Sequence, residues 1–150
     1  MLIGIQRIND NIYYLNTKHD GTYGAMKTGW QFINGSWYGF KGNGSAYLGL
    51  QNINNHWYYF DRTSGAALTG WQSINDHWYY FDPVNAWSQI GWFRSAAGYW
   101  YYFNNGGTML TGWQWINGHW YFMDNNGAMI TGARWINGTL YHFNNSGSLR

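Results

Sequence analysis

The chain has 150 residues, of which 23% are aromatic and 9% are charged, and its formal net charge is +2. The eight cationic residues are scattered, which excludes the dense basic patch of a nucleic-acid-binding protein, and the absence of Cys excludes disulfides and thiolate metal sites. No segment is apolar enough to insert into a membrane, and the opening segment does not resemble a signal peptide. If the protein acts outside the cell, we therefore expect this chain to be a piece of a longer one.

A glycine that opens each repeat recurs along the chain at intervals of 20 to 25 residues. It divides the chain into seven repeats, which we interpret as a single module over residues 1–150. In chain order the repeats span residues 4–28, 29–48, 49–69, 70–90, 91–111, 112–131 and 132–150. These repeats leave no segment long enough for a second domain.

Each repeat is predicted to form a β-hairpin. In the sixth repeat, residues 113–116 and 119–123 would be strands around Asn117-Gly118, because both turn residues tolerate the positive φ of a type I′ turn. The same turn position holds Asn34-Gly35, Asn137-Gly138, Asn75-Asp76 and Asn54-Asn55. Since one hairpin is marginally stable alone, we expect an all-β fold in which stacked hairpins share a continuous core, as in a solenoid.

The two-residue turn also predicts the register of each hairpin. In the fourth repeat Trp71 would face Tyr80, and side chains alternate along a strand, so Trp71, Trp78 and Tyr80 would project from one face. The opposite face would carry Ile74, Tyr79 and Phe81. The pattern thus predicts a row of large rings on one face and an ordinary packing face on the other.

The pattern G-W-x-x-I-N-G-x-W-Y-Y-F-D-x-x-G-x-M-x-T-G resembles the cell-wall-binding repeats of the choline-binding protein family. It is also similar to the related glucan-binding repeats of bacterial glucosyltransferases. The clearest copies are GWQSINDHWYYFDPVNAWSQI and GWQWINGHWYFMDNNGAMIT, and the resemblance covers essentially the whole chain. It implies a left-handed β-solenoid with about three hairpins per turn and ligand grooves between successive hairpins.

In that family each choline site resembles a box of two Trp from one repeat and a Tyr from the next, often with a Met nearby. Such a box suits a trimethylammonium group, which is positive and weakly hydrated and cannot donate a hydrogen bond. Electron-rich ring faces attract it by up to about 2 kcal/mol per desolvated contact.

Together with the predicted register, the resemblance implies grooves of unequal completeness. The groove between repeats four and five is the most complete and would hold Trp71, Trp78, Tyr102 and Met109. The groove between repeats two and three would hold Trp30, Trp37 and Tyr59, with Ala67 where Met is expected. The groove between repeats five and six would hold Trp92, Trp100, Phe122 and Met129.

Other grooves depart further from the pattern. Repeats six and seven would offer Trp113 and Trp120, with His142 in the Tyr position, and repeats three and four would offer Trp57 and Tyr80, with Leu50 in the first Trp position. Repeats one and seven lack the Trp pair and are expected to act as caps. Their residues at the Trp positions are Ile5, Ile12, Ala133 and Leu140.

Several of these residues also have a plain structural interpretation. The paired Trp could be core, although they share a face with a Tyr and lie opposite a separate packing face. Trp87, Trp115 and Trp135 lie outside the pattern and are assigned to packing or to saccharide contact without preference. His56, His77 and His119 share one repeat position, which favours solenoid surface over a metal site. Asp61, Asp82 and Asp124 share a second repeat position, just after the second strand, which favours a role in forming the following turn through the side chain.

The sequence favours a binding module without catalytic activity, metal or cofactor, because no Glu is present and no carboxylate pair or nucleophile motif stands out. The first hypothesis is recognition of choline on teichoic or lipoteichoic acid. The alternative is recognition of an α-glucan, since flat rings also stack on sugars. A third class is a structural spacer, and self-association could accompany binding. The expected location is extracellular, at a bacterial cell surface or cell wall or within a phage lysin, beside an enzyme domain of the parent protein.

Overall fold

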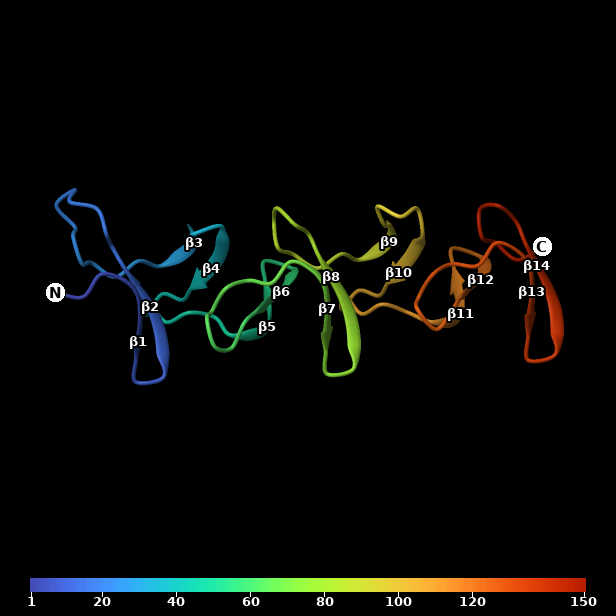
Figure 1. Cartoon of the computed structure of the whole chain (residues 1–150), viewed down its shortest axis with the longest axis horizontal. Coiled ribbons are helices and arrows are strands. Elements are labelled where there is room, and N and C mark those ends of the chain that lie inside the picture. The colour runs from blue at the N-terminus through green and yellow to red at the C-terminus, as the bar shows by residue number, and fades with distance from the viewer. The chain divides into compact units, whose positions relative to one another are not determined.

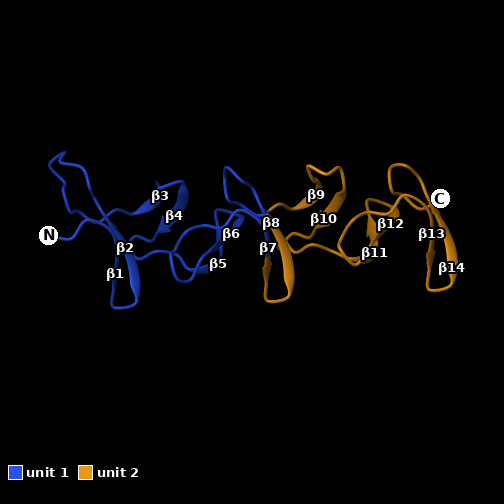
Figure 2. Cartoon of the chain, in the orientation of Figure 1, with its two compact units in different colours: residues 1–72, 81–88 blue, residues 73–80, 89–150 orange.

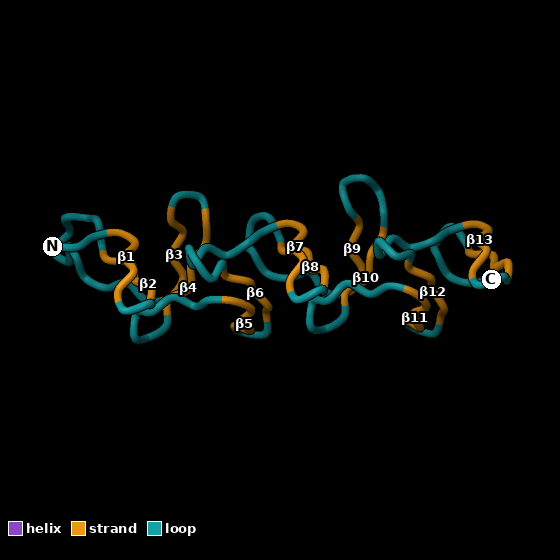
Figure 3. The backbone as a smooth tube through the Cα atoms, turned by 60° about the horizontal axis from the view of Figure 1, so that its bottom comes forward, coloured by secondary structure: helices purple, strands orange, loops and turns teal.

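The computed structural model describes all residues from 1 to 150 and consists of short strands joined by turns and loops (Figures 1 and 3). It holds no helix long and apolar enough to cross a membrane. The strands are β1 (Gly4–Ile8), β2 (Asn11–Leu15), β3 (Gly29–Ile33), β4 (Ser36–Phe40), β5 (Gly49–Ile53), β6 (His56–Phe60), β7 (Gly70–Ile74), β8 (His77–Phe81), β9 (Gly91–Arg94), β10 (Trp100–Phe103), β11 (Gly112–Ile116), β12 (His119–Met123), β13 (Gly132–Ile136) and β14 (Thr139–Phe143).

The strands pair consecutively into seven two-stranded antiparallel sheets, which we number as hairpins one to seven in chain order. The linker after each hairpin takes the same number. In hairpin six, Trp113 pairs with Phe122 and Ile116 with His119, as the two-residue turn predicts. Asn117 and Gly118 have φ values of 49° and 82°, which confirms the turn type inferred from the sequence. The all-β hairpin fold is therefore confirmed.

The core consists of one large side chain from the end of the second strand in hairpins two to seven, joined by its neighbours on the same face. Phe60, Phe81 and Met123 are fully buried, and Phe103 and Phe143 are 1% exposed. In hairpin four the predicted packing face is confirmed, because Ile74 and Tyr79 are buried with Phe81. The opposite faces of the hairpins carry the exposed rings.

From linker two onward, a backbone hydrogen bond joins each linker to the hairpin that precedes its own. The N–H of Met129 in linker six donates to the carbonyl oxygen of Trp100 in hairpin five at 2.8 Å, and the N–H of Ala67 donates likewise to Trp37 at 2.8 Å. The same linker position forms a bridge to its own hairpin, since Met129 pairs with Met123. These bonds set one hairpin against the next, which is the stacking expected of a solenoid.

The chain divides into two compact units (Figure 2). Unit 1 comprises residues 1–72 and 81–88 and contains hairpins one to three with most of linker four. Unit 2 comprises residues 73–80 and 89–150 and contains hairpins five to seven. Hairpin four contributes strand residues to both units.

Candidate ligand-binding grooves

Each groove described below begins with two Trp side chains at right angles on one hairpin. The ring centres of Trp30 and Trp37 are 6.3 Å apart with an interplanar angle of 89°. The pairs Trp92–Trp100 and Trp113–Trp120 repeat this geometry, at 6.3 Å and 86° and at 6.2 Å and 89°. The register explains the recurrence, because the two Trp lie diagonally across the antiparallel pair on the same face, within reach of aromatic side chains.

A Tyr of the next hairpin closes each pair. Tyr58 lies 4.7 Å from Trp30, Tyr121 lies 4.9 Å from Trp92, and Tyr141 lies 4.9 Å from Trp113, between ring centres. In its own hairpin each of these Tyr lies on the face opposite to the two repeat positions that hold the Trp pair in hairpins two, five and six. Stacking therefore sets the ring-rich face of one hairpin against the packing face of the next.

This arrangement corrects the third ring predicted from the sequence. Tyr59, Phe122 and His142 were expected beside the Trp pairs, but the structure places the preceding residue there in each case. Successive strand residues point to opposite faces, so an error of one position exchanges the two faces. Phe122 instead lies 5.1 Å from Trp113 of its own hairpin, and Tyr102 lies 5.0 Å from Trp92 of its own hairpin.

Linkers supply the remaining walls of the grooves. Between hairpins five and six, Met129 lies beside the rings as expected, with Asn145 and Ser146 of linker seven, around a space of about 380 Å³. Between hairpins six and seven, Leu149 stands beside Trp113 and Trp120, around about 370 Å³. The wall thus differs from groove to groove while the Trp pair stays the same.

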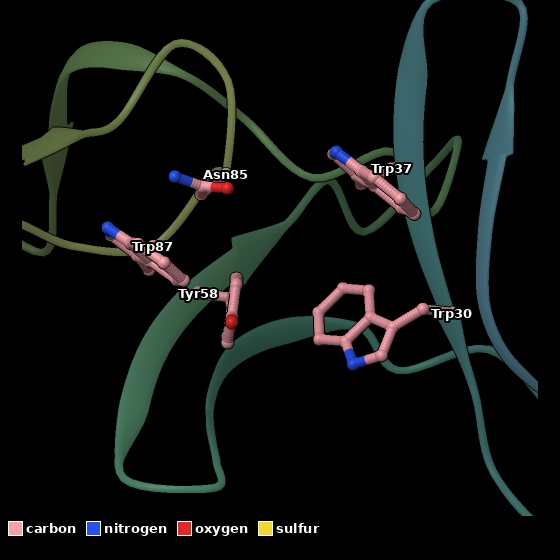
Figure 4. Close-up of a pocket in the computed structure, with 5 residues that line it drawn as sticks. All are labelled: Trp30, Trp37, Tyr58, Asn85 and Trp87. Carbon is pink, nitrogen blue, oxygen red and sulfur yellow. The ribbon is translucent and has the colours of Figure 1, made fainter.

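The groove between hairpins two and three has a fourth ring. Trp30, Trp37 and Tyr58 are joined by Trp87 and Asn85 from linker four around a space of about 260 Å³ (Figure 4). Ala67 is buried and small, and Trp87 occupies the side of the groove that a linker closes. The sequence left Trp87 between packing and saccharide contact. One signal in the sequence could have identified Trp87 as a groove residue. It is a large ring at a linker position that holds small side chains in linkers three, five and six, namely Ala66, Thr108 and Ala128.

Hydrogen bonds hold this groove in shape. The indole N–H of Trp37 donates to the carbonyl oxygen of Val84 at 3.0 Å, which fixes the ring against linker four. Asp82 accepts the backbone N–H groups of Val84 and Asn85 at 2.9 and 2.8 Å, so the predicted turn role of this carboxylate is confirmed. Burial raises the pKa of the Tyr58 hydroxyl, because a charged phenolate would be poorly solvated there. No charged side chain lines the groove.

The remaining predicted site residues fall partly in different units. Trp71 belongs to unit 1, whereas Trp78, Tyr102 and Met109 belong to unit 2, where the Met109 N–H donates to the Trp78 carbonyl oxygen at 2.8 Å. Trp57 accepts the Ser88 N–H at 2.7 Å in unit 1. Tyr80 stacks on Phe93 at 4.3 Å in unit 2. Tyr102 lies against Trp92 of its own hairpin, as Phe122 lies against Trp113, whereas the assignment of the other residues named here to ligand grooves stays a sequence-based prediction.

The histidines do not gather into a metal-binding cluster, since no three His, Cys, Asp or Glu side chains lie together. His56 instead stacks on Trp87, with ring centres 4.5 Å apart and planes at 17°. Asp61 and Asp124, like Asp82, accept backbone N–H groups of the following turn. These side chains shape loops and support the rings.

Comparison with known proteins agrees with this architecture. The choline-binding repeat matches residues 27–69, 47–88, 68–111, 90–131 and 110–149. Choline binding protein F from Streptococcus pneumoniae is 33% identical with a TM-score of 0.89, and CbpJ from Streptococcus pneumoniae TIGR4 is 34% identical with a TM-score of 0.90. Each alignment covers 99% of this chain and 52% of the other, so the chain spans about half the length of these proteins.

The multimodular pneumococcal cell wall endolysin from phage Cp-1, solved in complex with choline, is 31% identical with a TM-score of 0.57. That alignment covers 82% of this chain and 37% of the endolysin. No curated protein matches the chain. Stacked hairpins with ring-lined grooves between them define a repeat-built binding module of the β-solenoid class. The chain belongs to the choline-binding repeat family.

Proposed function

We propose that this chain is a non-catalytic module that attaches to a bacterial surface by binding choline on teichoic or lipoteichoic acid. The observation that carries the proposal is the recurring three-ring geometry, in which a perpendicular Trp pair is closed by a Tyr of the next hairpin. Ring faces that converge from several sides attract a trimethylammonium group without needing to accept a hydrogen bond from it. Several such grooves on one chain would add avidity for a polymer that carries many cholines.

Ring orientation favours choline over a flat sugar in these grooves. A sugar stacks on an open ring face, whereas two rings at 86° to 89° form a concave corner that fits a compact, nearly spherical group. The groove between hairpins two and three is lined by four rings and a single amide side chain, so a ligand with many hydroxyls would find few partners there. An uncharged aromatic lining suits a weakly hydrated cation.

The relatives support the same ligand class. The phage endolysin was solved with choline, and choline binding protein F was solved with ipratropium, which is also a quaternary ammonium compound. We further propose that this module acts outside the cell, at a cell surface or cell wall, within a longer protein. The remainder of that protein would carry the enzyme activity, as in a cell-wall hydrolase, a phage lysin or a glucosyltransferase.

The alternative function is recognition of an α-glucan. It is favoured by three exposed rings outside the boxes, Phe32, Trp115 and Trp135, which are 61%, 60% and 68% exposed. Open ring faces of this kind suit sugar stacking. They occupy a single repeat position, in hairpins two, six and seven, and each is one open ring rather than a box of several, so they support the alternative less strongly than the boxes support choline.

The test compares choline, its uncharged isostere 3,3-dimethylbutan-1-ol, and dextran, by calorimetry and thermal melting. We expect choline to raise the melting temperature, because ligand at a hundredfold its Kd stabilises the folded state by about 2.7 kcal/mol. The isostere should bind at least about tenfold more weakly, since it lacks the charge. A melting shift with dextran and none with choline would transfer the proposal to the α-glucan. Equal binding of choline and its isostere would refute recognition of the cation by the rings.

A further inference from the structure

A second hollow lies directly beyond Trp37, outside the box of Trp30, Trp37, Tyr58 and Trp87. It has a volume of about 410 Å³ and shares Trp37 and Asn85 with that box. Its lining adds Phe32 and Ser36 of hairpin two and Thr69 of linker three. Both spaces lie within unit 1, so one ligand could extend from the box into this hollow.

Trp37 is the partition between the two spaces. On one side it meets Trp30 at 89°, and on the other it meets Phe32 with ring centres 5.0 Å apart and planes at 54°. The hydrogen bond from the Trp37 indole N–H to the Val84 carbonyl oxygen fixes the orientation of this ring between Trp30 and Phe32. A group bound in the box is therefore separated from the hollow by the width of one indole ring.

The lining of the hollow has the character of a site for a neutral sugar. Phe32 presents a ring that is 61% exposed, which can stack on the C–H face of a pyranose. Ser36, Thr69 and Asn85 supply two hydroxyls and one amide, which can donate to and accept from sugar hydroxyls. No charged side chain lines the hollow, so nothing in it attracts a phosphate or a second cation.

The same arrangement of rings recurs in unit 2. Trp115 occupies in hairpin six the position that Phe32 occupies in hairpin two, and it is 60% exposed. Its ring centre lies 5.2 Å from that of Trp120 at 59°, which matches the contact between Phe32 and Trp37. Hairpins three to five hold Asn52, Ser73 and Arg94 at this position. The outer ring is thus confined to certain hairpins.

We propose that the hollow beyond Trp37 is a saccharide subsite, which holds a neutral sugar residue of the same polymer whose choline occupies the adjoining box. This inference rests on the proposed function, because the choline anchors the polymer at Trp37. Phe32 is the stacking platform, and Ser36, Thr69 and Asn85 bind the sugar hydroxyls. The module then recognises choline together with the sugar that carries it, and it discriminates a decorated glycan from free choline.

The test uses three probes that grow outward from the box, namely choline, phosphocholine, and methyl α-glucopyranoside esterified with phosphocholine at its 6-hydroxyl. Binding at this groove is followed through the NMR signal of the Trp37 indole N–H, assigned by its loss in Trp37→Phe. We expect the sugar conjugate to bind roughly three- to tenfold more tightly than phosphocholine, a gain equivalent to one stacked ring contact. Phe32→Ala should abolish that gain and leave the affinity for choline within about twofold. Phe32→Trp should retain the gain, because hairpin six has Trp at this position.

Three outcomes would overturn the subsite. Equal affinity for the conjugate and for phosphocholine would show that the sugar makes no contact. Equal weakening of choline and the conjugate by Phe32→Ala would show that Phe32 only positions Trp37. Equal affinity of the Phe32→Ala and unmodified proteins for the conjugate would exclude Phe32 as the platform. If choline itself fails to bind the unmodified protein, the proposed function fails as well, and that result is separate from any effect of Phe32.

Discussion

Tyr121 lies 4.9 Å from Trp92 of the preceding hairpin, while the adjacent Phe122 lies 5.1 Å from Trp113 of its own hairpin, between ring centres. Two consecutive residues of β12 therefore serve two different grooves. We predict that Tyr121→Ala weakens choline binding between hairpins five and six by about 1–2 kcal/mol, the value of one cation–π contact.

Phe122→Ala is the matched control, because it removes a neighbouring ring from the same strand. Its effect should fall on the Trp113 and Trp120 indole signals during a choline titration, and those of Trp92 and Trp100 should titrate as in the unmodified protein. The reverse pattern would restore Phe122 as the third ring of the groove between hairpins five and six.

The second prediction concerns the fourth ring of the groove between hairpins two and three. Trp87→Ala removes the wall opposite Trp30 and Trp37, so we expect choline to bind this groove several-fold more weakly. Trp87→Phe should recover part of the affinity, because it restores a ring face at this wall. Trp87 also packs against the buried cluster of Tyr58, Phe60, Ala67 and Ala86, so both variants should melt at lower temperatures.

Affinity for that groove is therefore measured well below the melting temperature of each variant, through the Trp37 indole signal. Unchanged affinity in Trp87→Ala, together with a lower melting temperature, would limit Trp87 to a packing role.

The limits of prediction from the sequence can be read from the same residues. The two-residue turns and side-chain alternation correctly predicted the strands and turn of hairpin six and the packing face that holds Ile74 and Phe81 in hairpin four. The third ring was misassigned because the face that one hairpin turns toward the next is not encoded within either hairpin. It depends on linker contacts such as the bond from the Met129 N–H to the Trp100 carbonyl oxygen.

Trp87 was not assigned to a groove for a related reason. It lies in linker four and reaches a groove that begins on hairpin two, so its neighbours appear only when three successive repeats are stacked. Comparison of the repeats shows that Trp87 is unusual at its position, but it does not predict that Trp87 lies beside Trp30.

The third prediction separates groove residues from core residues within one hairpin. Trp100 is 40% exposed and Phe103 is 1% exposed, although both lie on β10. Phe103→Ala should lower the free energy of unfolding by about 3–5 kcal/mol, because it leaves a cavity in the core. Trp100→Ala should cost much less stability and should remove one choline-binding event. Urea denaturation and calorimetric stoichiometry measure the two effects. If Trp100→Ala keeps the stoichiometry and loses as much stability as Phe103→Ala, Trp100 is a core residue.

The last prediction concerns acid. The backbone N–H groups of Ser64 and Thr63 hold the pKa of the Asp61 carboxyl below its usual value of 3.8, and the hydroxyl and N–H of Thr22 do the same for Asp20. A carboxyl whose pKa is lower in the folded state stabilises the fold above its unfolded pKa, and this contribution disappears as the pH falls through the folded pKa. We therefore expect the urea midpoint to be level near pH 5 and to fall below about pH 4.

Because Asp20 is exposed and Asp61 is only partly buried, the decrease should be modest. The matched variant is Asp20→Asn with Asp61→Asn, since Asn104, which is equivalent to Asp61, already accepts the N–H groups of Gly106 and Thr108 in linker five. It keeps an oxygen acceptor at each turn and removes the titration of both carboxyls. Its urea midpoint should therefore decrease less than that of the unmodified protein between about pH 5 and pH 2.5, the interval in which Asp carboxyls titrate. An equal decrease in both proteins would assign the acid sensitivity to groups other than these two turns.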